Sequence, residues 1–207
     1  MSEASDVFPA IKAPDTTAPL LEAIAHRWSP RAFLDKAVPA DVLKTLFEAA
    51  RWAASCFNEQ PWRYCVALKA DAEGFEKLLS ILAPKNQEWA KGAPVLLLSM
   101  GRKTFTHNNA VNRHGLHDTG AASATLAIQA ASMGLQLHQM AGFDADKARL
   151  VLKIPAEFEP AAAGALGYPG PASTLPETFQ KGELAPRPRK PLGEILFNAA
   201  FGSALKV

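Results

Sequence analysis

The sequence predicts an α+β fold with a central, mostly antiparallel sheet flanked by helices. Segments with apolar residues at helical spacing come first, and later segments alternate between strand and helix patterns. The chain has 207 residues, of which 48% are hydrophobic and 20% charged, which suffices for a sizeable core. We therefore expect an extended N-terminal arm over residues 1–19 and a single domain over residues 20–207.

The first half of that domain contains three predicted helices and one strand. Residues 20–28 and 40–54 carry apolar side chains at helical spacing, and residues 29–39 connect these two helices. Residues 62–70 alternate between apolar and other side chains, which indicates a strand. Residues 73–82 complete this half as a helix.

The second half begins with a continuous apolar run over residues 93–100, which predicts a buried strand. Residues 117–135 are small and apolar on most faces, as in a helix buried on several sides. Asp118 is interpreted as its cap, and the alternative is that Asp118 approaches a bound cofactor. A helix over 143–154 and a strand over 161–169 follow. A proline-rich tail then leads to the end of the chain.

Composition and simple motifs exclude several classes of protein. The 22 Lys and Arg residues against 20 Asp and Glu residues leave a charge of +2 without a basic stripe, so no nucleic-acid partner is expected. No apolar run approaches the roughly 18 residues of a membrane span, and the N-terminus lacks signal-peptide features. Cys56 and Cys65 fit neither a zinc motif nor a disulfide framework, so a cytoplasmic setting is expected. His114 and His117 lack an evident third ligand, so no metal site is expected.

The segment HRWSPR, at residues 26–31, is a candidate phosphate-binding segment. Arg27 and Arg31 bracket Ser29, and guanidinium groups bind phosphate through paired, charged hydrogen bonds. The alternative is a solvated helix end. Near the end of the chain, Arg187 and Arg189 alternate in an extended segment, so their side chains would point the same way; the alternative is an ordinary basic tail.

Two further segments carry groups suited to a planar ligand. In SCFNEQPWR, at residues 55–63, Asn58 and Gln60 offer donors and acceptors that could bind the edge of a heterocycle, although a capped turn is the alternative. In HQMAGFD, Gly142 permits close backbone approach, and the helix start at Asp144 presents N–H groups. Its alternative is an ordinary strand-to-helix turn.

Taken together and in this order, these segments resemble the nitroreductase family of FMN-dependent oxidoreductases, over about residues 20–203. The run SCFNEQPW is the most specific part. The resemblance implies a homodimer with FMN at the interface and a C-terminal segment that extends over the partner. It also implies that the flavin carries the redox chemistry, so that no catalytic side chain is expected.

The resemblance assigns twelve residues to FMN binding. Two groups near the ends of the domain would hold the phosphate and ribityl chain, the central loop would lie beside the flavin across the interface, and a later backbone N–H would face flavin N5. These residues are Arg27, Trp28, Ser29, Arg31, Ser55, Asn58, Gln60, Asn86, Ala141, Gly142, Arg187 and Arg189. One departure is Ala54, which stands where the family usually has proline.

The implied activity is the reduction of nitroaromatics, quinones or related small electrophiles by NADH or NADPH in a ping-pong sequence. Two alternatives stay open: the same flavin fold with other redox chemistry, such as dehalogenation or reduction of small aldehydes or enones, and a non-catalytic flavin-binding dimer. Residues 101–116, which are polar and match no element pattern, are the candidate lid on the substrate side.

Overall fold

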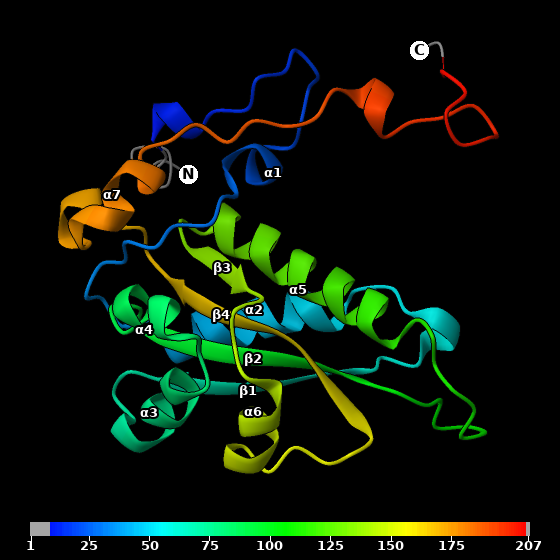
Figure 1. Ribbon diagram of the computed structural model, residues 1–207, viewed down its shortest axis with the longest axis horizontal. Coiled ribbons are helices and arrows are strands. Elements are labelled where there is room, and N and C mark those ends of the chain that lie inside the picture. Colours follow the sequence, from blue (N-terminus) through cyan, green and yellow to red (C-terminus); the bar gives the residue numbers. More distant parts are fainter. Residues whose placement is uncertain (1–8, 206–207) are drawn as a thin grey trace.

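The computed structural model describes residues 9–205 and contains one four-stranded sheet in the order β1-β2-β4-β3 (Figure 1). The strands are β1 (Trp62–Leu68), β2 (Val95–Arg102), β3 (Gln136–Met140) and β4 (Phe158–Gly167). Every neighbouring pair is antiparallel. The predicted α+β fold with a mostly antiparallel sheet is therefore confirmed.

Helices cover both faces of this sheet. The helices α2 and α5 lie on one face, and α3, α4 and α6 lie on the other (Figure 1). The seven α-helices are α1 (Glu22–His26), α2 (Ala40–Arg51), α3 (Ala72–Ser80), α4 (Pro84–Ala90), α5 (Gly115–Ser132), α6 (Ala145–Val151) and α7 (Glu177–Glu183) among the described residues. Short 3-10 turns are η2 (Ala10–Lys12), η3 (Cys56–Asn58), η4 (Ala172–Thr174) and η5 (Leu192–Glu194). Within this described part, no helix is long and apolar enough to cross a membrane.

Strand β2 explains why the sheet needs helices on both sides. Successive side chains of a strand point to opposite faces. Val95 and Leu97 accordingly pack into the core formed with α2 and α5, where Leu126 is fully buried. Leu96 and Leu98 pack into the second core, against α3 and α4. Because both faces are buried, the sequence of β2 begins with a continuous run of apolar residues.

Three elements were not predicted from the sequence: α4, α7 and β3. The two helices have seven residues each, too few to show a helical period, and β3 has five residues of mixed polarity. The predicted helix over 143–154 is also shorter, since α6 ends at Val151. Between β2 and α5, residues 103–114 form a loop with a bridge between Thr104 and Val111.

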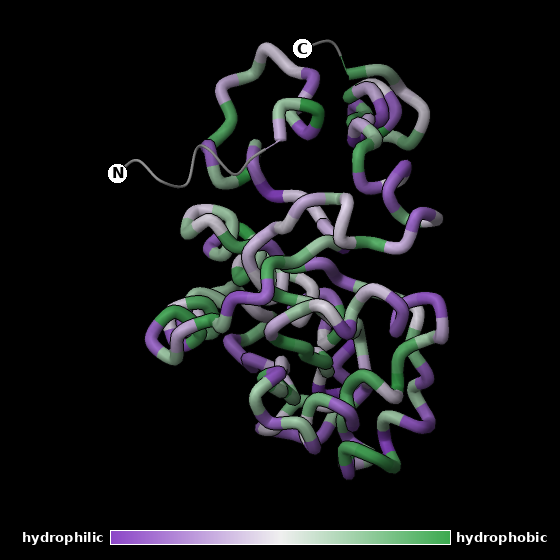
Figure 2. The backbone as a smooth tube through the Cα atoms, turned by 90° about the vertical axis from the view of Figure 1, so that its left-hand side faces the viewer, coloured by the Kyte–Doolittle hydropathy of each residue, from purple (hydrophilic) through white to green (hydrophobic). Residues whose placement is uncertain are grey.

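The N-terminal and C-terminal segments of the described chain meet at Lys12, which bonds to Ala185 and Arg187. Residues 192–205 then project from the body (Figures 1 and 2). The described part of the predicted N-terminal arm is extended except for the turn η2. Residues 1–8 of that arm lie outside the described range.

Candidate functional site

The HRWSPR segment is held against β3 by two polar side chains. The Gln136 Oε1 atom accepts a hydrogen bond from the Trp28 N–H at 3.0 Å, and its Nε2 donates to the His26 carbonyl at 3.1 Å. The His138 Nδ1 atom lies 2.9 Å from the Pro30 carbonyl, which can only accept, so Nδ1 carries the proton. The backbone of the predicted phosphate segment is thus fixed along one edge of the sheet.

Helix α7 holds the end of the same segment. The carboxylate of Glu183, only 4% exposed, accepts hydrogen bonds from the Arg31 N–H at 2.9 and 3.0 Å and from the Ala32 N–H at 3.0 Å. Burying a carboxylate is costly unless it is hydrogen-bonded, and these backbone donors satisfy it. The segment is therefore held from two sides, with the side chains of residues 27 and 29 facing a cavity.

That cavity has a volume of about 260 Å³ and combines residues from both ends of the chain. Its lining includes five of the predicted FMN-binding residues: Arg27, Trp28, Ser29, Arg187 and Arg189. Lys12, which the sequence analysis did not single out, adds a fourth cationic side chain. No acidic side chain is among the described residues that line it.

The electrostatics of this cavity favour an anion. Burial lowers the pKa of the Arg27 guanidinium, and the nearby Arg189 lowers it further. The pKa of Arg187 is also lowered, by burial first and then by the charges of Arg27 and Arg189. The Trp28 Nε1 donor is buried with no hydrogen-bond partner among the described residues. Clustered cations are the groups that a phosphate ester would satisfy, so the residues present fit the phosphate of FMN.

The Arg187 side chain also links three chain segments around the cavity. Its guanidinium donates hydrogen bonds to the carbonyl oxygens of Lys12, Ala25 and Arg27, the last at 2.7 Å. One side chain therefore joins the N-terminal segment, the end of α1 and the C-terminal segment.

Three other predicted residues meet at the end of β3. The Asn86 Nδ2 atom, on α4, donates to the Gly142 carbonyl at 3.0 Å, and Ala141 directly precedes that glycine. A Cβ atom at position 142 would lie 2.6 Å from Asn86 Nδ2. Glycine at this position thus lets α4 approach the turn closely.

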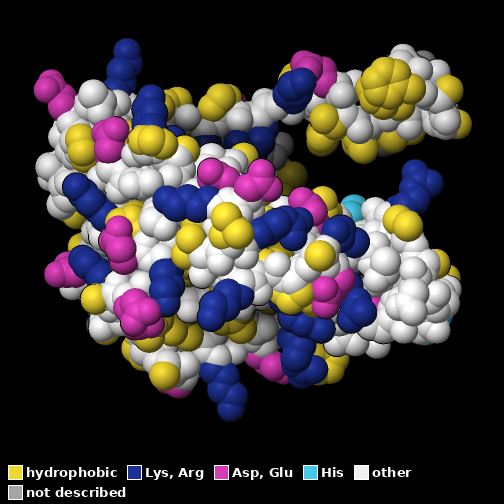
Figure 3. All heavy atoms as spheres, turned by 60° about the horizontal axis from the view of Figure 1, so that its bottom comes forward, with side chains coloured by type: hydrophobic (Ala, Val, Ile, Leu, Met, Phe, Trp, Pro, Cys, Tyr) yellow, Lys and Arg dark blue, Asp and Glu magenta, His cyan; other side chains and the backbone are white. Residues whose placement is uncertain are grey.

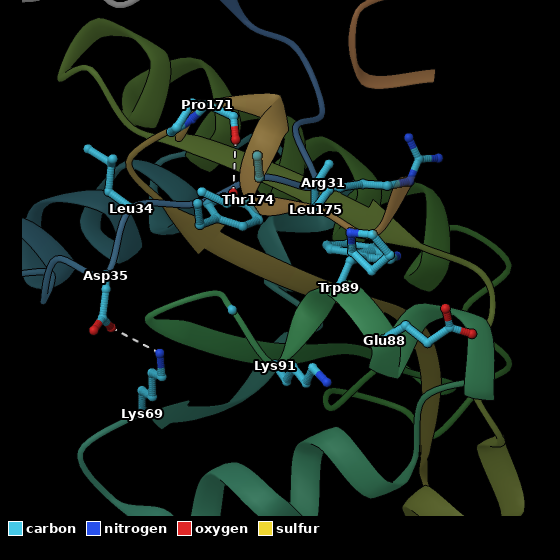
Figure 4. A pocket seen from close by; sticks show the side chains of 14 residues that line it. Arg31, Leu34, Asp35, Lys69, Glu88, Trp89, Lys91, Pro171, Thr174 and Leu175 are labelled. Atoms are coloured by element: carbon cyan, nitrogen blue, oxygen red, sulfur yellow. Dashed lines mark hydrogen bonds and ion pairs between the residues drawn. The ribbon is translucent and has the colours of Figure 1, made fainter. Parts of the chain in front are cut away.

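A second cavity, of about 710 Å³, is lined in part by α4, and Figure 4 shows its lining. Of the predicted residues only Arg31 lines it, together with Trp89 of α4. Asp35 and Lys69 form an ion pair across 2.9 Å on the opposite side (Figure 4). Because charges of both signs line this open space, it indicates no particular ligand.

The SCFNEQPW loop has an unusual backbone. Phe57, Asn58 and Gln60 have φ angles of 52°, 55° and 51°, in the left-handed region that non-glycine residues rarely adopt. The Ser55 Oγ atom accepts a hydrogen bond from the Gln60 N–H at 3.0 Å, and Gln60 Nε2 donates to the Asn58 carbonyl at 3.1 Å. Strained backbone that is braced in this way is typical of functional sites.

Asp118 supports this loop, and the interpretation of Asp118 as a helix cap was wrong. The N-cap of α5 is His114. The Asp118 carboxylate, 4% exposed, instead accepts a hydrogen bond from the Cys56 N–H at 2.9 Å. A buried carboxylate on α5 therefore fixes the start of the strained loop.

The candidate lid packs against the same loop. The Glu59 carboxylate accepts hydrogen bonds from the Thr106 N–H at 2.9 Å and from its hydroxyl at 3.1 Å. The rings of Phe57 and Phe105 meet edge to face with centroids 5.7 Å apart. The loop over 103–114 and the SCFNEQPW loop thus form one unit.

Within this chain, the SCFNEQPW loop does not meet the cationic cavity. The loop at η3 lies beyond one end of α5, whereas α1 and residues 185–189 lie toward the other end of the molecule (Figure 1). The structure therefore places Arg27, Ser29 and Arg187 at one cavity. It separately bonds Asn86 to Gly142. The loop that carries Ser55, Asn58 and Gln60 lies away from the cationic cavity. Among residues 9–205, no cluster of three or more His, Cys, Asp or Glu side chains could hold a metal ion.

Three residues that build these sites were missed by sequence reasoning: Lys12, Gln136 and Glu183. Each acts on a segment far away in the chain; Lys12 and Ala185, for example, are 173 positions apart. No local pattern marks such residues.

Comparison with known proteins gives a consistent result. The sequence model of the Nitroreductase family matches residues 24–168. A solved structure described as an oxidoreductase containing FMN superposes with a TM-score of 0.85 at 34% identity, covering 91% of this chain and 96% of that one. A provisionally named nitroreductase from Desulfovibrio desulfuricans, solved in complex with FMN, has a TM-score of 0.68 at 26% identity, covering 90% and 99%. A protein of Stenotrophomonas maltophilia, provisionally named NADH dehydrogenase/NAD(P)H nitroreductase, is 28% identical over 163 residues, 70% of this chain and 82% of that protein.

Proposed function

Because this chain belongs to the nitroreductase family, we propose that it binds FMN and uses NADH or NADPH to reduce nitroaromatics, quinones or related small electrophiles. The observation that carries the proposal is the cavity lined by four cationic side chains and, among the described residues, by no acidic one. FMN, when bound, supplies the two-electron redox chemistry.

The work of the chain is then binding and orientation. Arg27, Ser29 and Arg187 would hold the phosphate, in a segment whose backbone is already fixed by β3 and α7. The turn at Ala141 and Gly142, braced by Asn86, would present backbone N–H groups to the ring. No side chain is assigned a proton-transfer role.

We further propose that two copies of the chain share each site. Ser55, Asn58 and Gln60 lie away from the cationic cavity of their own chain, so a partner would have to bring them to it. The C-terminal segment also exposes apolar side chains that suit a second copy: Leu192 and Phe201, the latter 93% exposed. Figure 3 shows apolar side chains on the C-terminal segment, which stands off the body with a gap beneath it.

The dimer is tested by sedimentation of the full chain and of a chain that ends after Pro191. We expect the full chain to sediment as a dimer and the shortened chain, which keeps both Arg187 and Arg189, to shift toward monomer and lose affinity for FMN. Burial of exposed apolar side chains drives association. A full chain that is monomeric while holding FMN would contradict the shared site.

The proposed activity is tested by the visible absorbance of the purified protein. We expect the spectrum of a bound flavin, bleaching on anaerobic addition of NADH or NADPH, and recovery on addition of a nitroaromatic or a quinone. Free FMN at the same concentration is the control.

The other outcomes separate the alternatives. A protein that is colourless and ignores added FMN contradicts the proposal. A bound flavin that neither nicotinamide bleaches favours the non-catalytic flavin-binding dimer. Bleaching without turnover of nitroaromatics or quinones favours other redox chemistry on the same fold.

A further inference from the structure

We propose that Lys12 binds the phosphate of the cofactor, so that the N-terminal segment over residues 9–19 forms one wall of the site. This inference rests on the proposed function. Lys12 lies outside the region of the family match and outside every motif of the sequence. It nevertheless lines the same cavity as Arg27, Arg187 and Arg189, and it is only 5% exposed.

The Lys12 ammonium is held at a fixed position beside the cavity. Its Nζ atom donates to the Ala185 carbonyl at 2.5 Å and lies 4.8 Å from the centre of the Trp28 ring. Its own carbonyl accepts a hydrogen bond from Arg187. An ammonium has three N–H donors, so two remain after the bond to Ala185. The group is thus pre-positioned with donors to spare.

The charge of Lys12 is poorly balanced by the protein. Within residues 9–205 its ammonium forms no ion pair with a carboxylate within 4.0 Å. Burial lowers the pKa of Lys12; Glu183 opposes this effect, and Arg187 and Arg31 add to it. Glu183 is itself occupied by backbone N–H groups. Since an unpaired buried cation is costly, an anion in the cavity would stabilise it.

A structural role for Lys12 is the competing explanation. The bond to Ala185 could serve only to fasten the N-terminal segment to the C-terminal one. If Lys12 only links these two segments, its loss should weaken the binding of FMN and of riboflavin equally. A phosphate-binding residue would instead act on FMN and not on riboflavin, which is the same flavin without the phosphate.

The test compares the affinities of Lys12→Met for FMN and for riboflavin in the full-length protein freed of flavin. Methionine keeps the apolar stem over Trp28 and removes the charge. We expect the Kd for FMN to rise about 10- to 100-fold, the usual range for losing a hydrogen bond between charged groups. The Kd for riboflavin should stay unchanged, and Lys12→Arg should retain most of the FMN affinity.

Lys36→Met is the matched control. The Lys36 ammonium lies 4.1 Å from the centre of the Tyr168 ring, so it makes the same kind of contact outside the cavity. Its substitution should leave both affinities unchanged. If Lys12→Met weakens the binding of FMN and of riboflavin equally, the proposal is overturned and Lys12 only links the two terminal segments. An unchanged FMN affinity would overturn the proposal as well.

Inorganic phosphate separates this inference from the proposed function. We expect phosphate to raise the unfolding temperature of the wild-type chain and to raise that of Lys12→Met much less, because ligands that bind the folded state stabilise it. If the wild type binds no flavin but shows this difference, the proposed function fails and the role of Lys12 stands. If phosphate stabilises both proteins equally, the role of Lys12 fails.

Discussion

Replacing Arg187 with methionine should raise the Kd for FMN by about 100- to 1000-fold, because its side chain both carries a positive charge and links the segments that line the cavity. The guanidinium lines the cationic cavity and also joins the carbonyls of Lys12, Ala25 and Arg27. Losing a charge-assisted contact to phosphate costs about 1.5–3 kcal/mol. Arg187→Met also removes the bonds that link the segments around the cavity, which weakens FMN binding further. The rise in Kd should therefore exceed the rise expected for Lys12→Met.

The measurement is the flavin retained after dialysis of Arg187→Met, followed by titration with FMN. Lys190→Met is the control: Lys190 lies in the same segment, is largely exposed and forms an ion pair with Glu194 at 3.9 Å. We expect the control to keep its flavin. If Arg187→Met binds FMN as the wild type does, Arg187 is not part of the phosphate site.

Acidification from pH 6.5 to pH 4 should remove about 3 kcal/mol of folding free energy through His138 alone. The pKa of His138 is lowered to about 4, mainly because burial disfavours the charged ring; the charge of Arg31 lowers it further, against the effect of the Pro30 carbonyl. The folded pKa lies below the unfolded value near 6.5. The folded state therefore keeps His138 neutral, and this contribution is fully present above pH 6.5 and is lost as the pH falls toward 4.

Denaturant unfolding at pH 7 and at pH 4.5 measures this effect. In His138→Asn the amide can still donate to the Pro30 carbonyl but does not titrate, so we expect a smaller loss of stability on acidification. His114→Asn, at an exposed position, should lose as much as the wild type. The attribution to His138 fails if His138→Asn and the wild type lose equal stability between the two pH values.

His138 also explains why part of the fold escaped prediction. The periodic segments were found: β2 was predicted because both of its faces are apolar. Strand β3 was missed because Gln136 and His138, on one face, are polar, and these two side chains hold the HRWSPR segment. The polar residues that position the site thus removed the apolar pattern by which β3 could have been predicted.

The candidate site was predictable only where residues themselves have a distinctive chemistry. Arginines at 27 and 187 were expected to meet, and the structure places both at one cavity. Asn86 and Gly142 were each assigned to FMN binding, and the structure bonds the Asn86 side chain to the Gly142 carbonyl. Lys12 and Glu183 could not be found in this way, because a single lysine in an arm and a single glutamate in a short helix look like ordinary surface residues until the fold buries them.

The joining of the two chain ends by Arg187 has a consequence for biosynthesis. The bond from Arg187 to the Lys12 carbonyl spans 175 positions, nearly the whole chain. A ribosome-bound chain that still lacks its last segment has an open phosphate cavity, whatever the state of its sheet. On the proposed function, flavin capture would therefore follow completion of the chain, and products that end before Arg187 would hold flavin weakly.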